Sequence, residues 1–332
     1  MNKANWYRGE GKRQHADGPA ELPVSLLNRH TDPAGYLADA GLADAVNVAL
    51  HLGQPLLLTG QPGTGKTQLA HSLAWELGFD EPLKFETKST SVSRDLFYTY
   101  DTLGRFHAVQ TGREQADPLD FITFNALGLA ILRANTIDNV RHLLNSDSGE
   151  HRRQRSVVLI DEIDKAPRDF PNDLLNEVEN MFFRIPELGN VTVTAEAEMR
   201  PVLVLTSNSE KNLAEAFLRR CVFYDLPFPD RDTLVRIVHS RMAEAITDRR
   251  ELLDDALDIF GQLRDPSAGL LKRPSTGELL AWLQVLVARS GEDGAFIRSE
   301  AMIEPTLSAM IKTAEDRPKA QALLEEWIGT AQ

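Results

Sequence analysis

The chain has 332 residues, enough for two domains with separate cores, and its 42% apolar content is ordinary for a soluble globular protein. No apolar run approaches the ~20 residues of a membrane span, and the N-terminal stretch lacks a signal-peptide core. A single cysteine, Cys221, excludes an intramolecular disulfide, and a net charge of −13 argues against a protein that works mainly on nucleic acid. We therefore expect a cytoplasmic protein without a membrane segment.

The first part of the chain leads to one glycine-rich stretch. Residues 1–35 are polar and rich in Gly and Pro, which predicts an arm. A helix is predicted over 38–52, and the apolar run 55–59 is typical of a buried strand. The stretch that follows reads Gly-Gln-Pro-Gly-Thr-Gly-Lys-Thr, and a predicted helix over 68–77 comes after it.

Strand, glycine loop and helix are the context of a P-loop. The glycines let successive N–H groups point into one concavity, which together with the helix N-terminus favours a phosphate. Lys66 can reach the β- and γ-phosphates, and the Thr67 hydroxyl can bind Mg²⁺. The stretch therefore predicts a nucleoside triphosphate site. Its predicted nucleotide-binding residues are Gly60, Gln61, Pro62, Gly63, Thr64, Gly65, Lys66, Thr67 and Gln68.

The rest of the chain alternates strands with helices as far as residue 226. Further strands are predicted at 82–87, 156–160, 201–206 and 221–226, with helices at 125–134, 137–144 and 171–180. This order indicates a mostly parallel, doubly wound α/β sheet. Two hairpins are predicted, one pairing 95–100 with 105–109 and one pairing 181–185 with 191–194. From residue 231 on only helices are predicted, at 234–245, 252–263, 276–288 and 301–314.

Hydrolysis also needs an aligned water and stabilisation of charge at the γ-phosphate. Asp161 and Glu162 follow the strand at 156–160, where a doubly wound sheet places its ligands. Asp161 can hold the hydration shell of Mg²⁺, and Glu162 can polarise the attacking water. Asn208 ends the next strand and can orient that water, although a turn-forming Asn is common at such a place.

Two basic stretches have open interpretations. Arg219 and Arg220 precede the last strand, where Arg220 first and Arg219 second could enter a neighbouring subunit's site as an arginine finger, or form a surface pair at a helix end. The run 151–155 is favoured as a solvated loop over a phosphate-binding patch.

Together these motifs resemble the AAA+ ATPases, and specifically their MoxR-type branch. The resemblance covers roughly residues 35–330 and rests on the Walker A match at 60–67, the Walker B match at 157–164, the sensor-1-like Asn208 and the sequence Phe-Leu-Arg-Arg-Cys at 217–221. It implies an αβα P-loop core with a five-stranded parallel sheet and a C-terminal all-helical lid domain. The expected parts are an arm at 1–35, a core at 36–228 with inserts near 94–155 and 181–196, and a lid at 229–332.

The resemblance also implies an activity and an assembly. ATP with Mg²⁺ is the expected cofactor, ATP hydrolysis the expected reaction, and a ring of identical subunits, usually six, the expected assembly. The family works as chaperone-like motors on protein clients, alongside proteins with a von Willebrand factor A domain. Its two hairpins face the pore and contact substrate.

Two departures and two alternatives remain. No arginine occupies the sensor-2 position, which Lys272 or Arg273 could replace, and the segment 111–155 is longer than the pattern needs, which suggests an insertion near the ring surface. One alternative keeps the ATPase but makes nucleic acid the client, as in helicase loaders or restriction-type motors. The other is a small-molecule P-loop kinase, against which Asn208, Arg219, Arg220 and the helical lid argue.

Overall fold

The computed structural model describes residues 7, 32–111, 117–144, 151–209, 213–290 and 300–329, so most of the predicted arm lies outside the described residues. The described chain divides into two compact units. The first comprises 38–61 and 65–227, and the second comprises 228–290 and 300–329 together with 32–37 and 62–64. No helix within the described residues is long and apolar enough to cross a membrane.

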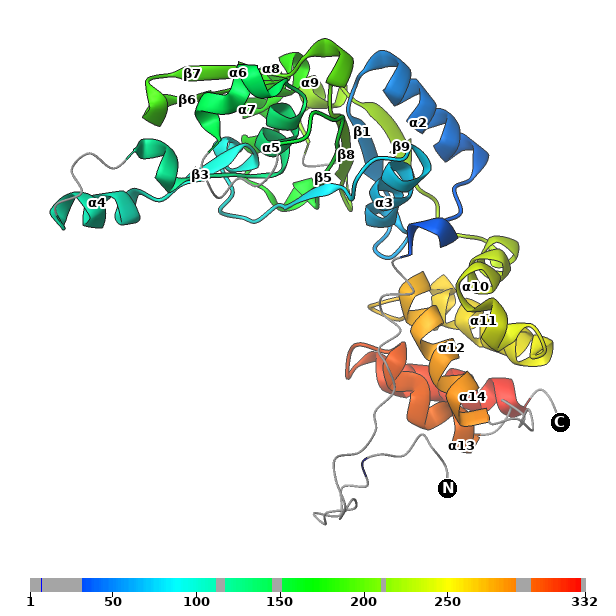
Figure 1. The fold of residues 1–332 in the computed structure, drawn as a ribbon. Coiled ribbons are helices and arrows are strands. Elements are labelled where there is room, and N and C mark those ends of the chain that lie inside the picture. The colour runs from blue at the N-terminus through cyan, green and yellow to red at the C-terminus, as the bar shows by residue number, and fades with distance from the viewer. Residues whose placement is uncertain are drawn as a thin grey trace, which may run out of the picture. The chain divides into compact units, whose positions relative to one another are not determined.

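The first unit is built on a five-stranded sheet, in which all neighbouring strands run parallel (Figure 1). In the order in which they lie side by side, its strands are β2 (Leu83–Glu86), β5 (Val157–Asp161), β8 (Val202–Thr206), β1 (Leu56–Thr59) and β9 (Val222–Asp225). Every residue of β1 and β5 is buried, whereas β2 and β9 at the edges alternate between half-buried and exposed residues. Central parallel strands are covered on both faces, which explains their continuous apolar sequence. The predicted five-stranded parallel sheet is confirmed.

The helices of this unit lie between the strands along the chain, and several of them pack on the sheet. They are α2 (Ala40–Leu52), α3 (Lys66–Glu76), α4 (Thr102–Gln110), α5 (Ala126–Arg133), α6 (Ile137–Val140), α7 (Phe170–Asp173), α8 (Leu175–Asn180) and α9 (Glu215–Leu218). Helix α3 packs on β5 and β8, and α2 packs on β1 and β9. Helix α5 packs on β2 and β5, and six of its eight residues are buried. The apolar residues of α5 therefore belong to the core of the unit, while the expected place of the segment 111–155 near the ring surface stays a prediction.

The hairpin predicted for 95–109 is wrong in its second half. Strand β3 (Tyr98–Tyr100) pairs instead with β4 (Ile122–Phe124), and residues 102–110 between them form helix α4. The Asp101 carboxylate caps this helix by accepting from the Gly104 N–H at 2.8 Å. A Cβ at Gly104 would lie 2.2 Å from that carboxylate, so a larger residue there would displace the Asp101 side chain. The apolar residues that looked like a strand recur every three positions and form one face of the helix.

The second hairpin is confirmed. Strands β6 (Phe182–Ile185) and β7 (Val191–Thr194) pair antiparallel, with Gly189 in the left-handed region between them.

The second unit is helical throughout its described residues. Its α-helices are α10 (Arg231–Ile246), α11 (Arg250–Arg264), α12 (Thr276–Ser290), α13 (Glu300–Ile303) and α14 (Asp316–Gly329), and their apolar faces form a core of their own around Trp282. The helix predicted for 301–314 is too long. Pro305 cannot donate a backbone hydrogen bond, and the α-helix gives way to a 3-10 helix over Glu304–Ala309. Helix α14 was not predicted. Pro318 lies in its first turn, where proline is tolerated.

Candidate nucleotide site

The glycine-rich loop joins the buried strand β1 to helix α3. Gly60, Gly63 and Gly65 all have positive φ, at 134°, 78° and 97°. A Cβ at Gly60 would lie 2.5 Å from the carbonyl oxygen of Leu226, so only glycine fits at the start of the loop. The sharp turn that these residues allow begins helix α3 directly at Lys66, as a P-loop requires.

Lys66 lies inside this loop with only 8% of its surface exposed. Its ammonium donates to the carbonyl oxygens of Gly60 and Gln61 at 2.7 and 3.0 Å, and to Oδ1 of Asn208 at 3.2 Å. Burial lowers the pKa of Lys66, while the carboxylates of Asp164 and Asp161 work to raise it. A cation held among carbonyl groups, in a glycine-rich loop at a helix N-terminus, is suited to an entering phosphate.

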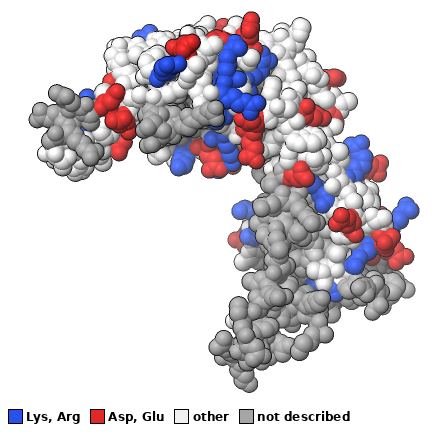
Figure 2. All heavy atoms as spheres, in the orientation of Figure 1, with Lys and Arg blue, Asp and Glu red and all other residues white. Residues whose placement is uncertain are grey.

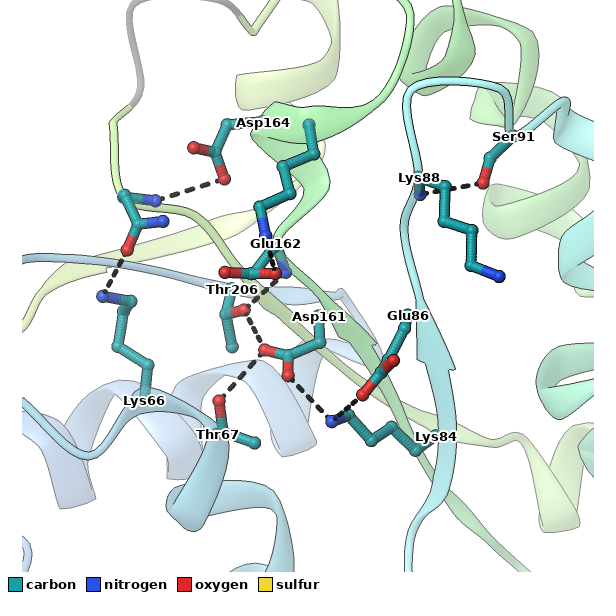
Figure 3. Close-up of polar contacts among 12 residues, drawn as sticks. Lys66, Thr67, Lys84, Glu86, Lys88, Ser91, Asp161, Glu162, Asp164 and Thr206 are labelled. Atoms are coloured by element: carbon teal, nitrogen blue, oxygen red, sulfur yellow. Dashed lines mark hydrogen bonds and ion pairs between the residues drawn. The ribbon is translucent and has the colours of Figure 1, made fainter. Parts of the chain in front are cut away.

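Asp161 ends β5 and is the centre of the polar contacts drawn in Figure 3. Its Oδ1 accepts from the hydroxyls of Thr67 at 3.0 Å and Thr206 at 2.6 Å. Its Oδ2 lies 3.2 Å from the ammonium of Lys84, which also donates to Glu86 at 2.7 Å. Burial works to lower the pKa of Lys84, but its hydrogen bonds to Glu86 and Asp161 raise it overall.

The two predicted magnesium ligands thus lie side by side. Thr67 and Asp161 supply a hydroxyl and a carboxylate, hard oxygen donors of the kind that Mg²⁺ takes together with phosphate oxygens and waters. Within the described residues no group of three or more His, Cys, Asp or Glu side chains could hold a metal by itself. The donor set therefore fits a magnesium ion that arrives with a nucleotide.

Glu162 follows Asp161 in the left-handed region, with φ 56° and ψ 50°. Its carboxylate forms an ion pair with the Lys165 ammonium, and its backbone N–H donates to the Thr206 hydroxyl at 2.9 Å. Asn208 lies beyond the end of β8, where its N–H donates to Asp164 at 3.3 Å while its side-chain oxygen accepts from Lys66. Glu162 and Asn208 therefore both lie at the carboxyl ends of the strands, and Asn208 contacts Lys66 of the phosphate loop. Figure 3 shows Glu162 near Asp161 and Thr206.

The remaining P-loop prediction concerns Gln68, in the first turn of α3. Its side-chain Oε1 is buried and has no hydrogen-bond partner among the described residues. Lys84 and Thr206 complete the site but were not predicted. Lys84 lies inside an edge strand, and Thr206 is the last residue of a buried one, so no motif marks either of them.

The predicted finger residues lie at the opposite edge of the same sheet. Arg219 and Arg220 come just before β9, which runs parallel to β1 with Val222 beside Leu56. At about 3.3 Å per residue, the four residues of β1 separate this edge from the P-loop by about 13 Å, farther than an arginine side chain reaches. The Arg219 guanidinium pairs with Glu215, and the Arg220 Nε lies 3.1 Å from the Glu179 carboxylate.

Lys272 and Arg273 lie in the helical unit, exposed in the loop before α12. The fully buried carboxylate of Asp316 accepts from the backbone N–H groups of Leu271 and Lys272 at 2.8 and 3.0 Å. These two hydrogen bonds lower the pKa of Asp316 against the effect of burial, which works to raise it. Asp316 therefore anchors the backbone of this loop at its first residues, next to the two cations.

The basic run before β5 is a loop whose side chains form ion pairs and hydrogen bonds with other residues of the chain. Arg153 pairs with Glu196, Arg155 donates to the Glu198 carbonyl and Gln154 donates to Asp80. On the face drawn in Figure 2, basic side chains gather in a band over the first unit, with acidic side chains beside it. These contacts favour the predicted solvated loop over a phosphate-binding patch.

Comparison with known proteins gives a family for the region that holds this site. The model of the ATPase family associated with various cellular activities (AAA) matches residues 56–226, which is 171 of the 332 residues. Among curated proteins no sequence match was found.

Solved structures of RuvB from Thermotoga maritima are similar to this chain. The structure described as its Holliday junction branch migration motor is 16% identical, with 81% of this chain and 66% of that chain covered and a TM-score of 0.42. A RuvB variant, also 16% identical, covers 85% of this chain and 72% of that chain with a TM-score of 0.45. This chain spans just under two thirds of the length of the first of these structures. Scores at this level carry nothing about what this chain binds.

Proposed function

Because this chain belongs to the AAA ATPase family, we propose that it is a MoxR-type AAA+ motor that hydrolyses ATP at the subunit interfaces of a ring and uses the energy to remodel protein complexes. The observation that carries the ATPase is the meeting of Lys66, Thr67, Asp161 and Glu162 at the carboxyl ends of β1 and β5. One site thus contains a phosphate-binding loop, two candidate magnesium ligands and a carboxylate that can accept a proton from water.

In the proposed reaction the P-loop N–H groups and Lys66 hold the β- and γ-phosphates. Thr67 and Asp161 would hold Mg²⁺, which neutralises charge on the phosphate oxygens when it is bound. Glu162 accepts a proton from a water as that water's oxygen bonds to the γ-phosphorus. The bond from the γ-phosphorus to the β,γ-bridging oxygen breaks, and ADP leaves with that electron pair. Asn208, which bonds Lys66 in this structure, orients the water or the γ-phosphate.

The position of the arginine pair supports a shared site. Arg220 lies at the amino edge of the sheet, so it cannot reach the phosphates of its own subunit. In a head-to-tail ring the same edge faces the next subunit's site, where the guanidinium would stabilise the charge that develops on the γ-phosphate. We assign the role of arginine finger to Arg220 first and to Arg219 second.

We assign the missing sensor-2 role to the loop at 271–274. Arg273 is the preferred cation for contacting the nucleotide, and Lys272 is the second choice. The hydrogen bonds from this loop to Asp316 support that assignment, since a fixed cation loses less entropy on binding than a mobile one.

Helix α4 supports a protein client over a nucleic acid. Leu103, Phe106 and Val109 form one exposed face of this helix, with 72%, 57% and 43% of their surface accessible. An apolar face suits a polypeptide, whereas a nucleic acid would need a row of cations. We propose that this face and the β6–β7 hairpin contact the client in the pore of a hexamer, in the cytoplasm, and that a protein with a von Willebrand factor A domain is the partner.

The decisive test is Glu162→Gln. We expect this variant to bind ATP and assemble normally, while turnover falls about 100-fold or more, since a general base contributes that much. The readouts are phosphate release, nucleotide binding and the mass of the assembly. Glu81→Gln, which alters an exposed carboxylate outside the site, is the matched control. Near-normal turnover in Glu162→Gln would exclude the proposed mechanism.

The client class and the reaction type are tested in the same assay. Salt-dependent stimulation of hydrolysis by DNA or RNA would favour the nucleic-acid motor. A phosphorylated acceptor in place of free phosphate would favour the kinase. We expect neither.

A further inference from the structure

One buried hydroxyl connects the two acidic residues of the site. Thr206 is the last residue of β8, and only 1% of its surface is exposed. Its Oγ1 donates to Oδ1 of Asp161 at 2.6 Å and accepts from the backbone N–H of Glu162 at 2.9 Å, as Figure 3 shows. A hydroxyl has one proton and two lone pairs, so it can serve both partners at once.

The sheet explains why this hydroxyl is at this place. Strands β5 and β8 run parallel, and Ile160 pairs with Leu205, so residue 206 is level with residue 161. The next residue, Glu162, has a left-handed backbone conformation, so the chain leaves the hydrogen-bond ladder of the sheet at this point. Its N–H then bonds to the side chain of Thr206.

The bent backbone at Glu162 is unfavourable by itself, since left-handed conformations are uncommon for residues other than glycine. Such a conformation persists where neighbouring groups hold it. Three described contacts hold it here: the Thr206 hydroxyl at its N–H, the Lys165 ammonium at its carboxylate, and the Lys165 N–H, which donates to its carbonyl oxygen at 2.9 Å. Only the Thr206 hydroxyl acts on the N–H, on the side of Asp161. Asp161, in contrast, keeps a second hydroxyl, from Thr67, on the same oxygen.

We propose that Thr206 is a positioning residue that fixes the backbone of Glu162 and so aims its carboxylate at the attacking water. The inference rests on the function proposed above, in which Glu162 accepts the proton. Removal of the hydroxyl leaves Asp161 held by Thr67 but frees the Glu162 N–H. Removal of the Thr206 hydroxyl is therefore expected to slow the chemical step and to leave nucleotide binding unchanged.

The kinetic test compares Thr206→Val, which keeps the shape and removes the hydroxyl, with Thr206→Ser, which keeps the hydroxyl. We expect kcat to fall at least about tenfold in Thr206→Val, with KM for MgATP within about threefold, because a small misplacement of a catalytic group is costly. Thr206→Ser should retain at least half of the wild-type kcat, as about half is within the usual spread of a conservative change. A purely structural role would not separate kcat from KM in this way, nor would serine rescue it.

A second measurement is independent of turnover. Hydrogen exchange at the Glu162 amide is followed by NMR in the full chain, and we expect exchange at least about tenfold faster in Thr206→Val than in wild type or Thr206→Ser. Thr59→Val is the matched control. Thr59 ends the neighbouring strand β1, is equally buried, and donates to the Asp225 carboxylate at 2.7 Å, away from Glu162. Thr59→Val should leave exchange at Glu162 unchanged.

The two proposals fail differently. Unchanged exchange at Glu162 in a folded Thr206→Val variant would overturn the positioning role, whatever the chain hydrolyses. Equal loss of kcat in the valine and serine variants would overturn it too. Normal turnover in Glu162→Gln would instead overturn the proposed function, and the exchange data would still report on Thr206.

Discussion

The two ends of the strands in the five-stranded sheet, called here the carboxyl edge and the amino edge, carry different sets of side chains. At the carboxyl edge, hydrogen bonds link Thr67, Asp161, Thr206 and Glu162, and Lys66 donates to Asn208 beside them. At the amino edge, Arg219 pairs with the exposed Glu215, and Arg220 pairs with the exposed Glu179 and donates to the Ala216 carbonyl. The carboxyl edge therefore has what binding and proton transfer need, while the amino edge holds a cation that its own site cannot use. In the proposed ring, a second copy would use this cation to complete its own site.

The largest expected effect concerns Arg220 at the amino edge and its action in a neighbouring subunit's site. In Arg220→Ala we expect kcat to fall about 10³-fold, the lower end of what an arginine finger contributes. MgATP affinity in dilute, unassembled subunits should stay within about threefold, less than 1 kcal/mol, because the finger belongs to the neighbour's site. Isothermal titration and phosphate release measure the two quantities. Arg219→Ala, whose guanidinium pairs with Glu215 one turn away, is the control and should lose far less activity.

Mixing variants tests the same point without relying on a loss of function. A Lys66→Ala subunit lacks a working loop but supplies Arg220, and an Arg220→Ala subunit does the reverse. If rings mix freely, about a quarter of the interfaces in an equal mixture combine an intact loop with an intact finger. Activity should therefore reappear on mixing. Two inactive variants that stay inactive together, although shown to co-assemble, would place both residues in one subunit's site.

The next effect belongs to the carboxyl edge. Lys66→Ala should weaken MgATP binding about 100-fold, since the loss of charged hydrogen bonds worth about 3 kcal/mol in total corresponds to two powers of ten. The defect should be equal in single subunits and in rings, unlike that of Arg220→Ala. Equilibrium binding at two protein concentrations distinguishes them. A binding defect present only in the assembled protein would contradict a role of Lys66 within its own subunit.

The sequence predicts the carboxyl edge better than it predicts the surroundings. Asp161, Glu162 and Asn208 each follow an apolar strand, and parallel strands end at the same edge, so the pattern of strands alone predicts that these side chains meet. Lys84 could not be expected, because a lysine in a half-exposed edge strand has no pattern that marks its partner. Thr206 could not either, since a threonine at the end of a buried strand is ordinary until its two partners are known.

Elements outside the sheet were harder to predict for a physical reason. In α4, the run 105–109 is short and contains Phe106 and Val109, so its sequence resembles that of a strand, and the contact that begins a helix instead is the cap from Asp101. In the helical unit, the sequence places Pro305 and Pro318 in similar surroundings, yet the first ends a helix and the second lies in a first turn. Proline restricts the chain in both cases, but only its position within the helix decides the outcome.

The smallest expected effect concerns how the cation at the amino edge is held. Glu179→Ala removes the partner of Arg220 Nε, and we expect kcat to change by less than about fivefold, because ion pairs between exposed groups are worth about 1 kcal/mol or less. The Arg220 guanidinium also donates to the Ala216 carbonyl at 3.0 Å, so it keeps one anchor. Glu215→Ala, which frees Arg219 in the same way, is the control. Since Glu179 and the γ-phosphate would both attract Arg220, a small rise in kcat is consistent with competition between them. A fall as deep as that of Arg220→Ala would instead mean that the finger works only while Glu179 orients it, and the amino edge would then be as organised as the carboxyl edge.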